Sequence, residues 1–245
     1  MPSATAEPTC SANPRRGQDL FDFVDAHPDG LSPEPLQRIL AQIADAVCFL
    51  HEHSIVHRDI KDENVVLDPE GNVRLIDFGS AAYVREGRKF DTFSGTLECA
   101  HFSLLLRSLA PKVDGTTERS FAAPEVLKGA RYSGKEQDIW ALGVTLYCLL
   151  FGDTPFMART EYELYNVIVR EPIRVPLVMG RERAWTGVGQ PWEGAGDGTE
   201  GREAIDLLGR LLEKDPTQRI TLEEVKVSLP LLLQLLILDA LANAL

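Results

Sequence analysis

Four polar side chains between Asp59 and Asp77 have the types and spacing that phosphoryl transfer requires. The stretch "HRDIKDEN", residues 57–64, contains Asp59, Lys61 and Asn64. Phosphoryl transfer needs an oriented hydroxyl, cations that neutralise the developing phosphate charge, and ligands for those cations. Asp59 can accept the hydrogen bond of an attacking hydroxyl, and Lys61 can reach a γ-phosphate. Asn64 and Asp77 offer the hard oxygen atoms that Mg²⁺ prefers.

A helix should precede this stretch. Ser32 can cap it and Pro33 suits its first position, while apolar residues recur at helical spacing from Leu36 to Leu50. The pattern predicts an amphipathic helix that ends near His53.

A small hairpin should follow it. Residues 64–79, "NVVLDPEGNVRLIDFG", form two short β-rich runs separated by turn-forming residues at 69–72. The hairpin would return the carboxylate of Asp77 beside Asn64, so that residues distant in sequence could share one metal site.

The remaining pattern is mostly helical. Residues 137–152, "QDIWALGVTLYCLLFG", are apolar on nearly every face, which predicts a helix buried on all sides. Residues 160–170 and 202–213 have weaker helical patterns. The glycine-rich stretch 187–201 could expose backbone N–H groups to a phosphate, but no strand precedes it, so we interpret it as a surface loop.

The composition excludes some functions. The chain has 245 residues, 44% of them hydrophobic, a formal net charge of −12 and a pI near 4.9. Nucleic-acid binding rests largely on clustered Lys and Arg, so we expect basic partners rather than nucleic acid. The four cysteines lie far apart with no CxxC pair, which favours a reducing, intracellular location in the cytoplasm or the nucleus.

The two ends of the chain have unusual compositions. Residues 1–16 lack the apolar core of a secretory signal and are predicted to be a disordered lead-in. The Leu-rich tail, residues 228–245, has an apolar run shorter than the ~18 residues that a membrane span needs. We expect no membrane span, and a membrane-tethered fragment is the least favoured alternative.

Four motifs together resemble the C-terminal lobe of a eukaryotic-type protein kinase. Residues 57–64 resemble the catalytic loop and "DFG" at 77–79 the magnesium motif. "APE" at 123–125 resembles the end of the activation segment, and "DIWALG" at 138–143 the buried central helix. The resemblance covers about residues 17–227. It implies a mainly α fold with a small β hairpin.

Three longer stretches look more specifically like the PAS-domain-containing serine/threonine kinases, although no PAS module is present here. They are "GQDLFDFVDAHPDGLS", "HRDIKDENVVL" and "LIDFGSAAYVREGRKFDTF". The resemblance implies a serine/threonine protein kinase that uses ATP and Mg²⁺ and acts on protein substrates.

The resemblance also implies roles for residues of the catalytic loop and the hairpin. Asp59 would be the catalytic base, and Lys61 would favour serine or threonine over tyrosine as acceptor. Asn64 and Asp77 would be the Mg²⁺ ligands.

Further implied roles concern ribose and substrate. Asp19 matches the residue that contacts the ribose of ATP. Asp19 and Glu63 match acidic positions that receive arginines upstream of the phosphoacceptor, so a basic substrate motif is expected. Each could instead be a solvated acid on a loop. Thr96 resembles the threonine that contacts Asp59 and Lys61.

The last implied roles are regulatory and structural. Arg58 would bind a phosphate on the activation loop, for which Thr92 is the best-placed acceptor. Arg219 would pair with Glu125 as a brace. The full set with expected structural roles is His57, Phe78, Gly79, Glu125, Asp138 and Arg219.

One departure from the family pattern lies upstream of Asp19. The 18 residues there contain no GxGxxG and no VAIK-like lysine. A five-stranded amino-terminal lobe needs about 25 residues in its strands alone. We therefore expect the N-lobe to be absent, with the chain beginning at the hinge and lacking the cover over ATP.

A second departure interrupts the activation segment. Residues 99–120 separate "GTLE" from "FAAPE", and removing these 22 residues restores "GTLEFAAPEVL". The insertion is either a retained intron or gene-model artefact, or a real loop, because long surface insertions cost little closure entropy. The tail at 228–245 also departs from the family ending.

Two functions of different classes remain. Intact Asp59, Lys61, Asn64 and Asp77 favour a serine/threonine protein kinase. The missing N-lobe lysine and glutamate favour inactivity of the chain as written, and hence a non-catalytic interaction module, either a lone C-lobe or a pseudokinase.

Overall fold

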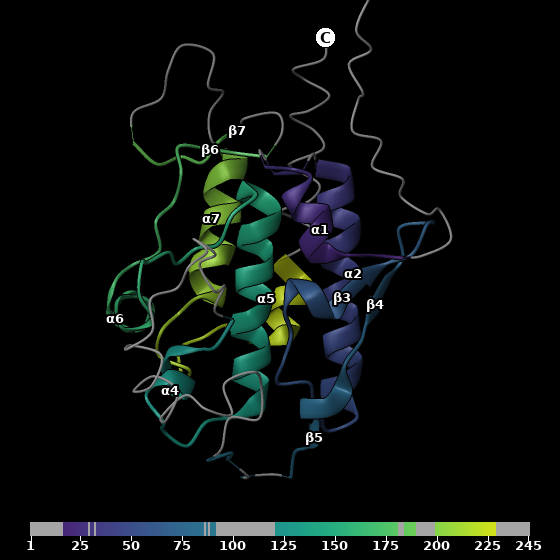
Figure 1. Cartoon of the computed structure of the whole chain (residues 1–245), viewed down its shortest axis with the longest axis vertical. Helices are drawn as coiled ribbons and strands as arrows, with labels where there is room; N and C mark the ends of the chain where they lie inside the picture. Colours follow the sequence, from purple (N-terminus) through teal and green to yellow (C-terminus); the bar gives the residue numbers. More distant parts are fainter. Residues whose placement is uncertain are drawn as a thin grey trace, which may run out of the picture.

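A long buried helix lies at the centre of the molecule. The computed structural model describes residues 17–28, 30–31, 33–85, 87, 89–91, 121–180, 184–189 and 199–228. Helix α5 (Gly134–Phe151) runs through the middle, with α2 (Pro33–Glu52) on one side and α7 (Thr199–Leu211) on the other (Figure 1). Shorter helices surround them: α1 (Leu20–Asp25), α4 (Pro124–Leu127) and α6 (Glu161–Arg170).

Helix α5 confirms the prediction of a helix buried on every face. All residues from Gln137 to Leu150 are buried. The helix begins three residues before the predicted start, because the polar first turn after Ser133 carries no apolar signal. It ends at Gly152, whose φ of 70° is the left-handed conformation that commonly closes a helix.

The predicted amphipathic helix is confirmed as α2. Its apolar side, which includes Leu40, Ile43 and Val47, is buried against the core. Asp45 lies on the opposite, exposed side. The regular spacing of apolar residues was therefore sufficient to place the helix and its buried face.

The predicted hairpin is also confirmed, but it is part of a larger strand arrangement. Strands β3 (Val65–Leu67) and β4 (Val73–Leu75) pair antiparallel, and β1 (Gln18–Asp19) adds to β3 to give the order β1-β3-β4. Two further pairs are β2 (Ile55–Val56) with β5 (Ala82–Tyr83) and β6 (Val178–Met179) with β7 (Ala184–Trp185). The additional two-residue strands were not predicted, because strands of that length show no measurable alternation.

Arg219 ties α4 to the carboxyl-terminal part of the chain. Its guanidinium donates to both carboxylate oxygens of Glu125, at 2.7 and 3.0 Å, and also to the carbonyls of Glu213 and Glu136. Its Cζ lies 5.1 Å from the centre of the Trp140 ring. A bidentate pair with this many additional acceptors can offset the cost of burying the two charges.

Lys214 connects α6 to the same region. Its ammonium donates to the carbonyl of Ile168 near the end of α6, and it lies 4.9 Å from the centre of the Phe156 ring. Burial lowers the pKa of Lys214 to about 8. The contact holds α6 against the core through an amine that is partly removed from water.

Several sequence-based predictions lie outside the described residues. These are the lead-in at 1–16, the insertion at 99–120, the Leu-rich tail beyond Ser228, and most of the glycine-rich stretch, at 190–198. Within the described part of the chain, no helix is long and apolar enough to cross a membrane.

Candidate active site

The buried carboxylate of Asp138 holds the start of the predicted catalytic loop, residues 57–64. Its two oxygens accept the backbone N–H groups of His57 at 2.9 Å and Arg58 at 2.7 Å. Asp138 lies on α5 and is fully buried. The loop is therefore fixed to the central helix through its backbone, independently of the side chains that would carry chemistry.

His51 supplies the third contact to the same carboxylate. Its ring Nε2 lies 2.9 Å from Asp138 Oδ2 and donates to it. His51 is in the last turn of α2 and is buried. One carboxylate thus joins α2, the catalytic loop and α5.

Arg58 adopts a backbone conformation that is unusual for a residue with a side chain. Its φ is 65°, in the left-handed region, which costs about 1–2 kcal/mol for a residue other than glycine. The conformation is held by the contact with Asp138 and by the side chain, whose Nε donates to the carbonyl of Ser80 at 2.7 Å. Such a locally strained residue persists only where its surroundings over-determine it.

The Arg58 guanidinium is buried beside the aromatic residues Phe90 and Tyr132. Its Cζ lies 4.5 Å from the centre of the Phe90 ring. Phe90 exchanges two backbone hydrogen bonds with Tyr132, of 2.8 and 2.9 Å. Burial raises the pKa of the Tyr132 hydroxyl, and the neighbouring Arg58 charge opposes that rise. Arg58 is 8% exposed, so its charge is largely removed from bulk water and lies beside an aromatic ring.

Three of the four predicted chemical side chains lie together. Asn64 Nδ2 donates to the backbone carbonyl of Asp59 at 2.8 Å and to Asp59 Oδ2 at 3.1 Å. Lys61 Nζ lies 3.8 Å from the same Oδ2. The side chain of Asp59 is 17% exposed and that of Lys61 is 24% exposed. Asp59 is therefore oriented by two neighbours and still open to a reactant.

Asp77 follows the second strand of the hairpin, β4, by two residues. The backbone N–H of Ile76 donates to the carbonyl of Asn64 at 2.9 Å, so the residue before Asp77 is fastened to the catalytic loop. His57 Nε2 donates to the Ile76 carbonyl at 3.1 Å from the other side. Asp77 has a φ of 59°, and its Oδ1 accepts the N–H of Gly79 at 3.1 Å. Its carboxylate is exposed.

The donor set fits a hard cation that arrives with phosphate oxygens. Asn64 Nδ2 faces Asp59, so the amide oxygen is directed away from that contact. Among the described residues there is no cluster of three or more His, Cys, Asp or Glu that could bind a metal alone. Mg²⁺ commonly takes one or two protein ligands and completes its shell with phosphate and water. The pair Asn64 and Asp77 fits that mode and does not fit a closed protein cage.

Asp19 and Glu63 lie on neighbouring short elements, because the single-turn helix that carries Glu63 contacts both β1 and α1. Asp19 caps α1, with its Oδ1 accepting the N–H of Asp22 at 2.8 Å, and it pairs through β1 with Val66. Glu63 is exposed on the single-turn helix η1 (Asp62–Asn64), which contacts α1. Asp22 adds a third acid on this side, which the sequence interpretation did not include.

Of the remaining predicted site residues, Phe78 is described by the structure, whereas Thr92 and Thr96 are not. Phe78 is 47% exposed, and its ring centre lies 4.9 Å from that of His57 in an edge-on contact. Thr92 and Thr96 lie outside the described residues, so their predicted roles remain predictions.

The sequence interpretation missed His51, Ser80 and Phe90. His51 resembles the polar end of an amphipathic helix, and its partner lies 87 residues away. Ser80 acts through its backbone carbonyl, which no residue type could reveal. A buried aromatic residue at Phe90 was detectable only as an apolar residue in a polar stretch.

Comparison with known proteins identifies the family. The family model described as protein kinase domain matches residues 12–229. The chain belongs to this family. The match does not test the expected absence of the amino-terminal lobe, which stays a prediction.

Within the family, the chain is similar to several curated serine/threonine-protein kinases. The chain is 36% identical over 210 residues to the serine/threonine-protein kinase ppk6 of Schizosaccharomyces pombe, covering 85% of this chain and 20% of the relative. It is 37% identical over 210 residues to the mouse PAS domain-containing serine/threonine-protein kinase, covering 85% and 12%. It is 35% identical over 211 residues to PSK2 of Saccharomyces cerevisiae, covering 84% and 14%. The chain thus spans a fifth or less of the length of these relatives.

Replacing Asp138 by asparagine should loosen the catalytic loop. The amide keeps the shape but presents an NH₂ group to one of three buried donors, so we expect a loss of about 1–3 kcal/mol in the free energy of unfolding. Urea denaturation followed by circular dichroism measures it. The matched control is Asp45→Asn, because the Asp45 carboxylate is exposed and, among the described residues, forms an ion pair with Lys226, at 3.6 Å. Equal stability of the two variants would contradict the role given to Asp138.

Proposed function

We propose that this chain forms the catalytic-loop part of a serine/threonine protein kinase, which transfers the γ-phosphate of ATP to protein substrates. The observation that carries the proposal is the contact of Asp59 with both Lys61 and Asn64, with Asp77 fastened beside Asn64 by the Ile76 hydrogen bond. The relatives named as serine/threonine kinases support it. Because the chain covers a fifth or less of the length of these relatives, the activity of the whole protein is part of the proposal.

Each side chain has a distinct task in this scheme. Asp59 accepts the hydrogen bond of the substrate hydroxyl and orients it toward the phosphate. Lys61, 3.8 Å from Asp59 Oδ2, places a positive charge where negative charge develops. Asn64 and Asp77 would hold Mg²⁺, which when bound supplies neutralising charge at the phosphates.

The described residues supply only one side of such a site. Ile76 and Phe78 are 42% and 47% exposed, although both are large and apolar and lie beside Asp77. Exposed apolar side chains at a polar site favour a further segment or partner that covers them. The same observation favours the second candidate, a non-catalytic kinase-like interaction module, if no nucleotide binds here.

The proposed protein substrates carry basic residues upstream of the phosphoacceptor. Asp19 and Glu63, with Asp22, form an acidic margin beside the catalytic loop, and the chain as a whole carries a net charge of −12. Arginine can pair with such carboxylates at two points. The same charge disfavours nucleic-acid partners, and we include an intracellular location in the proposal.

Phosphate on Thr92 remains a proposed means of regulation through Arg58. The Arg58 guanidinium already contacts Ser80 and Phe90. A phosphate would therefore add to an arginine that is held in place, and would order the activation segment more than the catalytic loop.

Replacing Asp77 by asparagine tests the metal site. Asparagine tolerates the left-handed conformation, so the fold should remain while the carboxylate is lost. We expect Mg²⁺ to strengthen ADP binding to the wild-type chain, and this gain to fall about tenfold or more in Asp77→Asn, equivalent to ~1.4 kcal/mol. Isothermal titration with and without Mg²⁺ measures it, with Asp25→Asn as control. A wild-type chain that binds no nucleotide would favour the interaction module.

Replacing Glu63 by glutamine tests the substrate preference. In the whole protein, the ratio of kcat/KM for peptides with and without an upstream arginine should fall about 5- to 10-fold, because one charge-assisted pair is lost. A peptide array measures the change. The control variant is Glu70→Gln, because Glu70 is an exposed acid on the hairpin turn. A wild-type protein indifferent to upstream arginine would refute the basic-substrate proposal.

A further inference from the structure

A glutamine on α2 holds the edge of the hairpin that carries the proposed metal ligands. Gln42 Oε1 accepts the backbone N–H of Val73 at 3.0 Å, and its Nε2 donates to the carbonyl of Gly71 at 3.3 Å. The same Nε2 is 3.0 Å from the carbonyl of Arg38, one turn earlier in the helix. The side chain thus bonds to two backbone groups of the hairpin, as a neighbouring strand would.

The Val73 N–H is available because of the register of the hairpin. Hydrogen bonds join Asn72 to Asp68 and Ile76 to Asn64, at 2.9 Å each. In an antiparallel pair, hydrogen-bonded positions alternate with positions whose N–H groups point outward. Val73 pairs with Leu67 at an outward position, and β4 is the edge of its sheet. Without Gln42 this partly buried N–H would lose its partner.

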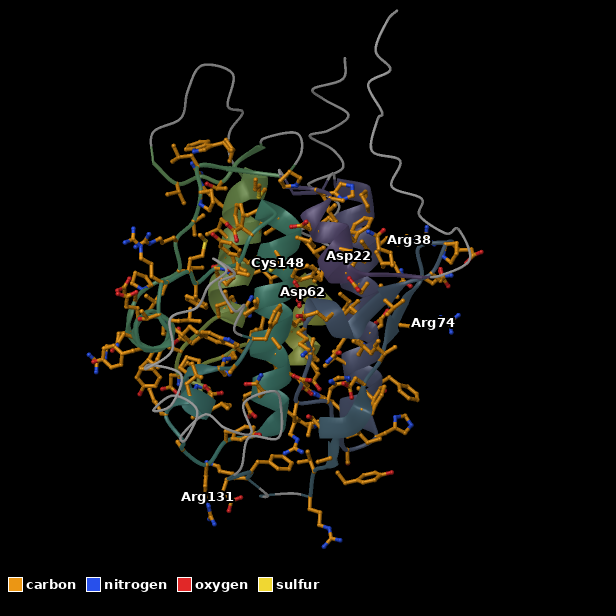
Figure 2. The ribbon with its side chains drawn as sticks, viewed as in Figure 1. Asp22, Arg38, Asp62, Arg74, Arg131 and Cys148 are labelled. Carbon is orange, nitrogen blue, oxygen red and sulfur yellow. The ribbon has the colours of Figure 1, made fainter. Side chains whose placement is uncertain are left out.

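The turn of the hairpin is closed by its own hydrogen bonds and is also bonded to α2. Asp68 Oδ1 accepts the N–H groups of Asn72 at 2.7 Å and Glu70 at 3.1 Å, and the Asn72 contact is the main cause of the lowered pKa of Asp68. Arg38 donates to the Glu70 carbonyl and to Asn72 Oδ1. Figure 2 shows Arg38 beside the outer end of the hairpin, away from the central helix.

The opposite end of the hairpin is the proposed metal site. Asn64 immediately precedes β3, and Asp77 follows β4 by two residues. The Ile76 to Asn64 hydrogen bond joins the backbone beside these two residues. Helix α2 also carries His51, which contacts Asp138 under the catalytic loop. The same helix is therefore the common support for the hairpin and for the catalytic loop.

We propose that Gln42 is a positioning residue for the proposed metal ligand Asp77, acting through the backbone of β4. This inference rests on the proposed function, because it assigns Gln42 to the same metal site. Gln42 touches neither nucleotide nor metal. It sets where the β4 edge lies on α2, and so where Asp77 stands relative to Asn64 and Asp59.

The variant Gln42→Leu tests the inference. Leucine fills similar space but removes both contacts to the backbone of the hairpin. The readout is Mn²⁺ titration of the full chain with saturating ADP, followed by water-proton relaxation, alongside ADP affinity without metal. We expect the half-saturating Mn²⁺ concentration to rise roughly 3- to 10-fold, below the roughly 10–100-fold typical of residues bonded directly to a metal ligand. Metal-free ADP affinity should stay unchanged.

Two further variants separate positioning from general stability. Gln42→Glu keeps the acceptor for the Val73 N–H but loses the donor to the Gly71 carbonyl, so its half-saturating Mn²⁺ concentration should lie between those of the wild type and Gln42→Leu. Tyr147→Phe removes one hydrogen bond elsewhere, from the Tyr147 hydroxyl to the Arg174 carbonyl at 2.8 Å, and should leave the Mn²⁺ titration unchanged. Urea unfolding of all variants tests whether each is folded and measures its loss in the free energy of unfolding.

The outcomes distinguish failure of the inference from failure of the proposed function. If Asp77→Asn weakens Mn²⁺ binding but Gln42→Leu does not, the inference is wrong and the metal site stands. A shift in Tyr147→Phe as large as that in Gln42→Leu would also overturn the inference. If the wild-type chain shows no metal-dependent ADP binding, or Asp77→Asn leaves it unchanged, the proposed function fails and the inference fails with it.

Discussion

The arrangement of the site depends on one buried carboxylate. Asp138 accepts three hydrogen bonds, from His51 and from the backbone of His57 and Arg58. Burying a carboxylate costs several kcal/mol, and hydrogen bonds to a charged group contribute about 1.5–3 kcal/mol each. Three such bonds can therefore balance the burial and also the ~1–2 kcal/mol of the left-handed Arg58. The result is a loop with one conformation, fixed before any ligand binds.

The other parts of the site are connected to this loop by a series of contacts, one after another. The Asn64 side chain contacts Asp59, the Asn64 backbone holds Ile76, and Asp77 comes next in the chain. Helix α2 supports both the loop, through His51, and the hairpin, through Gln42. The side chains proposed to take part in the reaction are thus the outer layer of a framework that is held together mostly by backbone contacts. This explains how Asp59, which is partly exposed, and Asp77, which is exposed, can still be well positioned.

The sequence predicted the elements better than the contacts between them. The helix at 33–52 and the hairpin at 65–75 follow from apolar spacing and turn composition, which are local signals. The cluster of Asp59, Lys61 and Asn64 was predictable because all three lie within six residues. His51 and Gln42 were not, because their partners lie 87 and 31 residues away and are a distant carboxylate and a backbone N–H. The strands β1 and β5 were too short to leave a pattern.

Amide hydrogen exchange in the unliganded wild-type chain tests most directly whether Asp138 fixes the catalytic loop. If it does, the His57 and Arg58 amide protons should exchange only through global unfolding, at the free energy measured for Leu146 in the centre of α5. Exchange of these two amides several orders of magnitude faster than that of Leu146 would show that the loop opens locally. That result would contradict the account of a preformed catalytic loop.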